Sequence, residues 1–327
     1  MVAFRVLTAV ALVAAVVATP GAASTALVEP GRTFSADAQV LALGLTGRNV
    51  VVAVDETRTR CPRVELWLGS NARHRFRSTI PDCKWGPSTS VGLTSVAVAG
   101  TRAFWITYGG GNTREWLLWT GSPTSAPRRL RLVRQDADSS EPPPLVLGDG
   151  TTRGVPFAVG NEIVYLGTNG KPIFRTIVAS PVRMLAAGPG PGRLEVAALL
   201  ASGWVVGLDG AGEEYAAEPY PQATVKDLQV TASGTAVHSG AEVEILHPRT
   251  HDATTVELPA GATMLDVAQQ RILYSLKGDL WAARIDTGER TRLVDGTLAK
   301  PALGQLSRYG LAWARDARIA WRSGTLP

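Results

Sequence analysis

The chain has 327 residues, of which 45% are hydrophobic and 19% are charged, and its formal net charge is +5. The apolar fraction is sufficient for a continuous core, and the 34 glycines and 21 prolines are spread along the chain, which argues against two domains joined by one Gly- and Pro-rich linker. The composition therefore favours one large all-β array over two average domains.

The first 23 residues have the pattern of a secretory signal peptide. Arg5 precedes an apolar run over 6–18, small residues follow, and we expect cleavage near Ala23. The run is about 13 residues long, shorter than the roughly 20 that span a bilayer as a helix. A retained N-terminal anchor is the alternative. No later stretch is long and apolar enough to span, so the sequence predicts a secreted or extracytoplasmic domain over 24–327.

Seven apolar runs have the character of the second strand of a β-propeller blade. A blade is a four-stranded antiparallel meander that repeats every 40 to 45 residues or so. The runs are 49–54, 103–108, 162–167, 204–208, 235–238, 271–276 and 311–315. They predict a single all-β propeller with seven blades. Six blades is the alternative, because the fourth and fifth units alternate poorly around 213–220.

Predicted inner and third strands flank these runs. The inner strands include 40–45, 94–99, 155–159, 194–200 and 228–231, and an insert over 134–153 lengthens the second unit. Trp67, Trp116, Trp281 and Trp321 fall at equivalent places on third strands, where we expect them to pack between blades.

The last blade lacks an outer strand, because the chain ends shortly after its third strand. The segment 32–35 precedes the first inner strand and can supply the missing one. Closure of the ring by the N-terminal strand would remove an open sheet edge.

The segment 265–294 is the most regular repeat, with strand-like runs separated by Gln269-Gln270, Lys277-Gly278 and Thr287-Gly288. Its core, DLWAARIDTGERTRL, is similar to repeats of secreted bacterial propellers of the TolB-like and WD40-like kind. In those repeats a Leu-Trp pair on the third strand precedes an acidic residue, a Thr-Gly turn and a basic outer strand. The resemblance implies the fold, and it transfers no catalytic residue, because that family contains both binding proteins and enzymes.

Cys61 and Cys83 predict one disulfide, because their even count suits an oxidising compartment. Cys61 precedes the third strand of the first blade, and Cys83 follows its outer strand over 74–79. In an up-and-down meander, the turn between the second and third strands lies at the same end as the link to the next blade. The two cysteines should therefore meet.

The same end of the ring carries the longer loops, and long loops on a rigid scaffold are where binding usually resides. We therefore expect the binding face there, with Arg60, Trp85, Tyr108 and Asn112 as its candidate residues. The alternative is that these are ordinary solvated loops and that Trp85 only covers the disulfide.

Basic residues alternate on the predicted outer strands, at Arg73, Arg75 and Arg77 and again at Arg129 and Arg131. Charges on an exposed edge strand oppose pairing with other molecules, and we favour this role over recognition of an anionic polymer.

Other polar patterns do not form a recognisable site. His247 and His251 are four residues apart, but Pro248 lies between them and no helix is expected there. Asp136, Asp138 and Ser140 alternate like calcium ligands, but Gly and Glu are missing at the later loop positions. No nucleophile elbow, phosphate loop or dinucleotide fingerprint is present. We expect no catalytic residue, cofactor or metal site.

The sequence therefore predicts a monomeric interaction module, outside the cell or at the cell envelope, whose partner is a protein or an envelope polymer. The basic pI near 9.5 would suggest nucleic acid in a cytosolic protein, whereas an exported protein meets anionic envelope polymers instead. The alternative is a secreted propeller enzyme, a hydrolase or lyase, that acts on carbohydrate or another envelope polymer, because scattered acids could pair in three dimensions.

Overall fold

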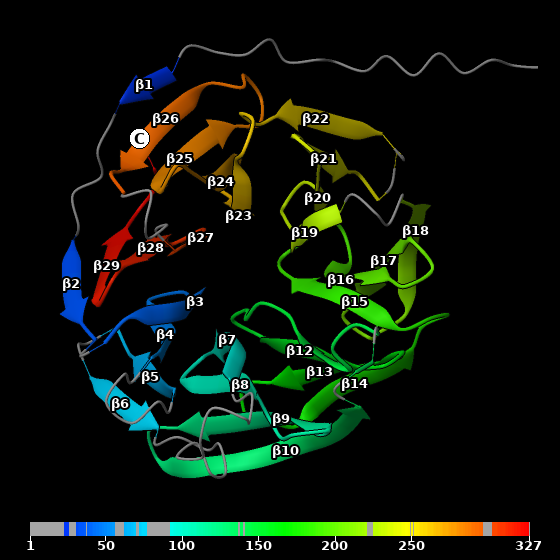
Figure 1. Cartoon of the computed structure of the whole chain (residues 1–327). Helices are drawn as coiled ribbons and strands as arrows, with labels where there is room; N and C mark the ends of the chain where they lie inside the picture. The colour runs from blue at the N-terminus through cyan, green and yellow to red at the C-terminus, as the bar shows by residue number, and fades with distance from the viewer. Residues whose placement is uncertain are drawn as a thin grey trace, which may run out of the picture.

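A computed structural model of the chain describes residues 23–25, 31–36, 38–55, 62–69, 72–76, 92–136, 138–139, 141–220, 225–248, 250, 252–296 and 303–326. In these residues every regular element is a β-strand, and none is a helix with the length and hydrophobicity needed to cross a membrane. Seven antiparallel four-stranded blades form a ring (Figure 1). This confirms the predicted seven-bladed propeller and excludes six blades.

Each blade runs from an inner strand at the axis to an outer strand at the rim (Figure 1). Blade 1 is β3 (Val40–Thr46), β4 (Asn49–Val54), β5 (Arg63–Trp67) and β6 (Arg73–Phe76); blade 2 is β7 (Gly92–Ala99), β8 (Arg102–Gly109), β9 (Thr113–Ser122) and β10 (Ser125–Asp136). Blade 3 is β11 (Leu145–Leu147), β12 (Gly154–Val159), β13 (Glu162–Gly167) and β14 (Pro172–Ile177); blade 4 is β15 (Val182–Ala187), β16 (Leu194–Leu200), β17 (Trp204–Asp209) and β18 (Glu214–Pro219). Blade 5 is β19 (Val225–Val230), β20 (Thr235–Ser239), β21 (Glu242–Leu246) and β22 (Ala253–Glu257); blade 6 is β23 (Thr263–Ala268), β24 (Arg271–Leu276), β25 (Asp279–Arg284) and β26 (Arg290–Val294). Blade 7 is β27 (Leu303–Ser307), β28 (Gly310–Arg315), β29 (Arg318–Ser323) and β2 (Arg32–Ser35).

The N-terminal strand closes the ring, as the sequence predicts. β2 is the outer strand of blade 7 and pairs antiparallel with β29, with Phe34 opposite Ile319. A second N-terminal strand, β1 (Ala23–Thr25), pairs parallel with β26 and becomes a fifth strand of blade 6. This second addition is not evident from the sequence.

The strands inside the ring are apolar because each blade packs against a neighbouring blade on both of its faces. In β4, Val50 and Val52 contact blade 7, whereas Val51 and Ala53 contact blade 2. Successive side chains of a strand point to opposite faces, so a strand buried on both sides becomes a continuous apolar run. The seven predicted apolar runs reflect this burial, although two of them, 162–167 and 204–208, are third strands and not second strands.

The four predicted core tryptophans lie on third strands, as expected. Trp67, Trp116 and Trp321 are buried, and Trp281 is half-buried against the core between blades 5 and 6. Their indole Nε1 atoms have no hydrogen-bond partner among the described residues, so these side chains contribute through ring packing.

The strand assignment predicted for blades 3 and 4 is wrong by one strand. The inner strand of blade 3 is the three-residue β11, which lies in the stretch assigned to an insert. The predicted inner strand at 155–159 is therefore in β12, the second strand, and 162–167 is the third. In blade 4 the segment 194–200 is likewise the second strand, behind β15. From blade 5 onwards the predicted order is confirmed.

Candidate binding site at the channel mouth

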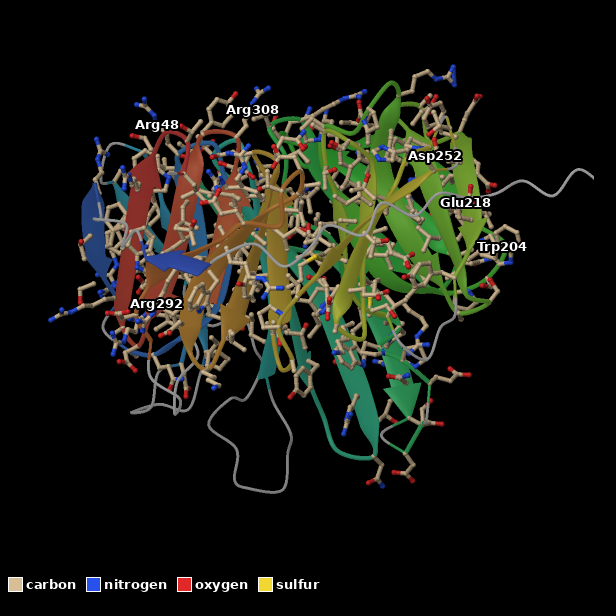
Figure 2. The ribbon with its side chains drawn as sticks, turned by 90° about the horizontal axis from the view of Figure 1, so that it is seen from above. Arg48, Trp204, Glu218, Asp252, Arg292 and Arg308 are labelled. Carbon is tan, nitrogen blue, oxygen red and sulfur yellow. The ribbon has the colours of Figure 1, made fainter. Side chains whose placement is uncertain are left out.

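A cavity of about 350 Å³ opens at one end of the central channel. It lies at the end where the inner strand of each blade turns into the second strand, and we call this end the turn face. Figure 2 shows two residues of these turns, Arg48 of blade 1 and Arg308 of blade 7, at the same end of the ring. Six of the seven blades line the cavity, chiefly through residues 45–47, 149–153, 187–189, 229–232, 266–269 and 305–309.

Asp266 and Gln305 tie blades together at the floor of the cavity. The backbone N–H groups of Val267 and Leu306 each donate to one carboxylate oxygen of Asp266, both at 2.7 Å, which joins blade 6 to blade 7. The side-chain amide of Gln305 donates to Oδ1 of Asp149 at 3.0 Å, and its Oε1 accepts the N–H of Leu45. Gln305 therefore links blade 7 to blades 1 and 3.

Three carboxyl groups share this floor and the channel behind it, and their pKa values are raised. Burial raises the pKa of Asp149 to about 6, against hydrogen bonds from Gln229 and Gln305 that lower it. Burial raises the pKa of Asp227 to about 7, and the charge of Asp149 adds to the rise. The pKa of Asp266 is also raised well above its usual range by burial and then by the charge of Asp149. Like charges and desolvation both favour the neutral acid.

The wall and rim of the cavity carry the groups that a partner would meet first. Arg153 is paired with Glu195, whose second carboxylate oxygen is buried without a hydrogen-bond partner among the described residues. At the rim, the guanidinium of Arg308 lies 4.6 Å from the ring centre of Tyr309, which is 41% exposed. The aromatic ring of Tyr309 and the guanidinium of Arg308 are therefore exposed at the mouth of the channel.

The C-terminal residues fold over the same end of the ring. The N–H of Leu326 donates to Oε1 of Gln269 at 2.9 Å, and Nε2 of Gln269 donates to the carbonyl of Ser307 at 2.6 Å. Gln269 and Gln270 both have a positive φ, 55° and 56°, in the turn from β23 to β24. Non-glycine residues are uncommon at such φ angles. Here tertiary hydrogen bonds hold both side chains, because Nε2 of Gln270 also donates to Oγ of Ser233 at 3.2 Å.

Neither Tyr108 nor Asn112, the two predicted binding residues that the structure describes, lies at this cavity. Tyr108 and Asn112 are at the opposite end of the ring, because β8 runs away from the turn face. Tyr108 is half-buried with its ring 5.2 Å from that of Trp116, and Asn112 is exposed. Arg60, Trp85, Cys61 and Cys83 lie outside the described residues. The predicted loop face and the predicted disulfide therefore stay predictions.

His247 has a local structural role. Its Nδ1 is 2.7 Å from the carbonyl of Ser233, and its Nε2 is 3.2 Å from Oγ1 of Thr254. His251 lies outside the described residues. Across the part of the chain that the structure describes, no three His, Cys, Asp or Glu side chains gather closely enough to hold a metal ion.

The residues of the channel floor were not predicted from the sequence, although the sequence contains a pattern that indicates buried polar groups there. Asp227, Asp266 and Gln305 are polar residues inside inner strands that read VKDLQV, TMLDVA and LGQLS. Acids in apolar runs usually mark buried, partnered groups. Their shared position next to the axis becomes visible only once the inner strands are placed around it.

No family model and no curated protein matches the sequence. Among solved structures, the fold is similar to a chain of the mitotic checkpoint complex, with a TM-score of 0.53 and 16% identity over 99% of this chain and 98% of that one. It is also similar to Raptor from Chaetomium thermophilum (TM-score 0.57, 13% identity, 90% of this chain and 29% of that one) and BamB from Moraxella catarrhalis (TM-score 0.46, 15% identity, 92% and 87%). At these identities the likeness to the first two structures is one of fold alone, and it agrees with the resemblance to propeller repeats.

Proposed function

We propose that this protein is an interaction module that acts outside the cytoplasm and holds a protruding segment of a partner protein at the channel mouth. The observation that carries the proposal is the cavity of about 350 Å³ at the turn face, to which six blades contribute. Its size is within the usual range of ligand pockets, and its walls are held rigid by the ring. The cavity is therefore a preformed binding site.

Two features of the rim favour a protein partner. Tyr309 and Arg308 are exposed side chains of the types that dominate binding energy in protein interfaces. They stand beside a cavity whose polar floor is largely occupied by internal hydrogen bonds, such as both oxygens of Asp266. The rim is thus free to contact a partner while the floor maintains the ring.

The test is capture of partners from an extracytoplasmic extract by the full chain. Replacing both rim residues, Arg308→Ala with Tyr309→Ala, should weaken capture at least tenfold, equivalent to about 1.4 kcal/mol. Asn112→Ala is the control, because Asn112 is exposed at the opposite end of the ring. If Asn112→Ala abolishes capture and the rim variant does not, the partner binds at the loop face and not at the cavity.

The proposed location outside the cytoplasm rests on the signal-like pattern of the first 23 residues. Cells that produce the full chain should place it outside the cytoplasm, and cells that produce a chain starting at residue 24 should retain it. Equal retention of both forms would contradict the proposal.

A secreted hydrolase or lyase that acts on an envelope polymer is the second candidate, and one observation favours it. The carboxyl groups of Asp149 and Asp266 line one cavity and both have raised pKa values, as acids in catalytic pairs do. Backbone hydrogen bonds already engage both oxygens of Asp266, which favours the structural role. Release of products from envelope polysaccharide by the wild type, but not by Asp149→Asn, would establish the enzyme.

A further inference from the structure

The outer strand of blade 2 presents the longest unpaired edge in the described part of the ring. β10 (Ser125–Asp136) has 12 residues, whereas the outer strands β6, β14, β18 and β22 have four to six. One side of β10 pairs with β9, and no described strand pairs with its other side (Figure 1). The backbone groups on that side are available to an added strand.

This ring already accepts extended segments at the edges of two other blades. β2 adds to β29 in an antiparallel arrangement, and β1 adds to β26 in a parallel one. In blade 6 the added strand is a fifth one, beyond the complete four-stranded sheet. The outer edge of a full blade in this ring therefore accepts a fifth strand, as blade 6 shows for a parallel one.

The side chains of β10 give its edge a strong positive charge. It carries Arg128, Arg129, Arg131 and Arg134 against a single acid, Asp136. Arg131 contacts Glu162 at 3.2 Å and Arg134 contacts Glu115 at 2.9 Å, so these two are partly neutralised.

Arg128 and Arg129 are exposed and form no ion pair with a described residue. The pKa of Arg102 is lowered by burial and then by the charge of Arg128, so these two cations lie near each other. A bulge separates Arg129, opposite Trp119, from Arg131, opposite Leu118, so these two arginines face opposite sides of the blade. Positive charge is therefore presented on both sides of the open edge.

We propose that the edge of β10 binds an extended acidic segment of a partner protein, which pairs with it as a fifth strand of blade 2. Backbone hydrogen bonds would supply affinity, and carboxylates on the two sides of the added strand would face Arg128 on one side of the blade and Arg129 on the other. The same charges disfavour a second copy of this chain, because two β10 strands would bring like charges together. This surface is separate from the channel mouth and binds independently of it.

The test is the binding to the full chain of a fluorescent peptide in which pairs of Glu alternate with pairs of Val, so that an extended peptide carries carboxylates on both sides. Binding is measured by polarisation at low salt. We expect saturable binding that weakens as salt is added, since exposed charges are screened. Arg128→Glu with Arg129→Glu should weaken it at least tenfold, and a peptide with Lys in place of Glu should bind that variant better than the wild type. Unchanged binding to the double variant would overturn the proposal.

Three controls separate the alternatives. Arg318→Glu with Arg322→Glu makes the same change of net charge on β29, whose edge β2 already covers, and should leave peptide binding unchanged. A peptide N-methylated at alternate amides cannot pair as a strand, so undiminished binding of that peptide would show a purely electrostatic contact and overturn strand addition. Self-association of the wild type through β10, seen by sedimentation and lost in the double variant, would also overturn it.

The rim variant Arg308→Ala with Tyr309→Ala should bind the peptide normally, because those residues lie at the channel mouth. Failure of the cavity proposal and failure of the edge proposal are therefore distinguishable. Melting temperatures of all variants, compared with the wild type, would separate lost binding from lost folding.

Discussion

At the scale of single residues, Glu65 is a fully buried carboxylate on β5 that gathers three arginines. Nε of Arg63 lies 2.9 Å and Nη2 of Arg73 lies 2.6 Å from its Oε1, and Nε of Arg75 is 3.6 Å away. The sequence predicts that Arg73 and Arg75 protect an edge, but both turn toward Glu65. These arginines compensate the buried negative charge of Glu65, which would destabilise the fold if it had no partner.

Glu65→Gln should destabilise the protein by about 3 kcal/mol, because it leaves buried guanidinium charge without its carboxylate. The measurement is the free energy of unfolding from urea denaturation. Glu115→Gln is the matched control, since Glu115 pairs with Arg134 at 2.9 Å on an exposed surface. That change should cost less than about 1 kcal/mol. Equal effects of the two substitutions would contradict a structural role for the cluster around Glu65.

At the scale of elements, β2 joins the two ends of the ring and also packs against the next blade. Phe34 of β2 is half-buried, and its ring centre lies 4.6 Å from that of Trp67 in blade 1. The strand therefore stabilises blade 7 by pairing and blade 1 by packing.

Phe34→Ala should lower the free energy of unfolding by about 2 kcal/mol, which is less than for a fully buried phenylalanine. Ser35→Ala, at an exposed position of the same strand, should change it by no more than about 0.5 kcal/mol. Urea denaturation of both variants checks this. A negligible effect of Phe34→Ala would mean that β2 contributes pairing alone.

The order of the strands could be predicted where the apolar runs are long. The prediction was wrong where a strand is short. NVVVAV in blade 1 and RILYSL in blade 6 are buried on both faces or flanked by tight turns, and both were placed correctly. LVL of β11 has only three residues and follows Pro142-Pro143-Pro144, so its pattern is indistinguishable from a loop. One overlooked short strand shifts the assignment of its neighbours until the next clear repeat.

At the scale of the whole molecule, acids from blades 3, 5 and 6 meet near the axis, and their titration affects the entire ring. The pKa values of Asp149 and Asp227 are raised by burial to about 6 and about 7. Between pH 4 and pH 7 the folded chain therefore binds more protons at these groups than the unfolded chain does. Their contribution to stability is complete below about pH 4 and is lost as pH rises through 6 to 7.

Asp227→Asn should make the unfolding free energy less dependent on pH between 4 and 8, and should stabilise the protein at pH 8 by up to about 4 kcal/mol. Asparagine keeps an oxygen to accept the N–H of Leu228, 2.9 Å away. Asp286→Asn is the control, because Arg284 lowers the pKa of the exposed Asp286 to about 2, outside this range. Parallel stability curves for the wild type and Asp227→Asn would refute the linkage.

The channel mouth could not be predicted from the sequence, because its residues come from six blades. Leu45 and Asp149 both form hydrogen bonds with Gln305. All three residues are far apart in the sequence, so their spacing gives no indication of these contacts. The number of blades and the closing strand were predictable, since they depend on local runs and on a missing outer strand. Sites at the axis depend on the ring itself.

The pairing of β2 with β29 also has a consequence for how the protein folds. The two strands are separated by almost the whole sequence, so this contact has one of the largest sequence separations in the molecule. Long-range pairing is slow, because the entropy of loop closure is lost before the contact is gained. We therefore expect blades to form from local hairpins first and closure of the ring to come last. A chain emerging N-terminus first would hold β2 without a sheet until β29 has followed it.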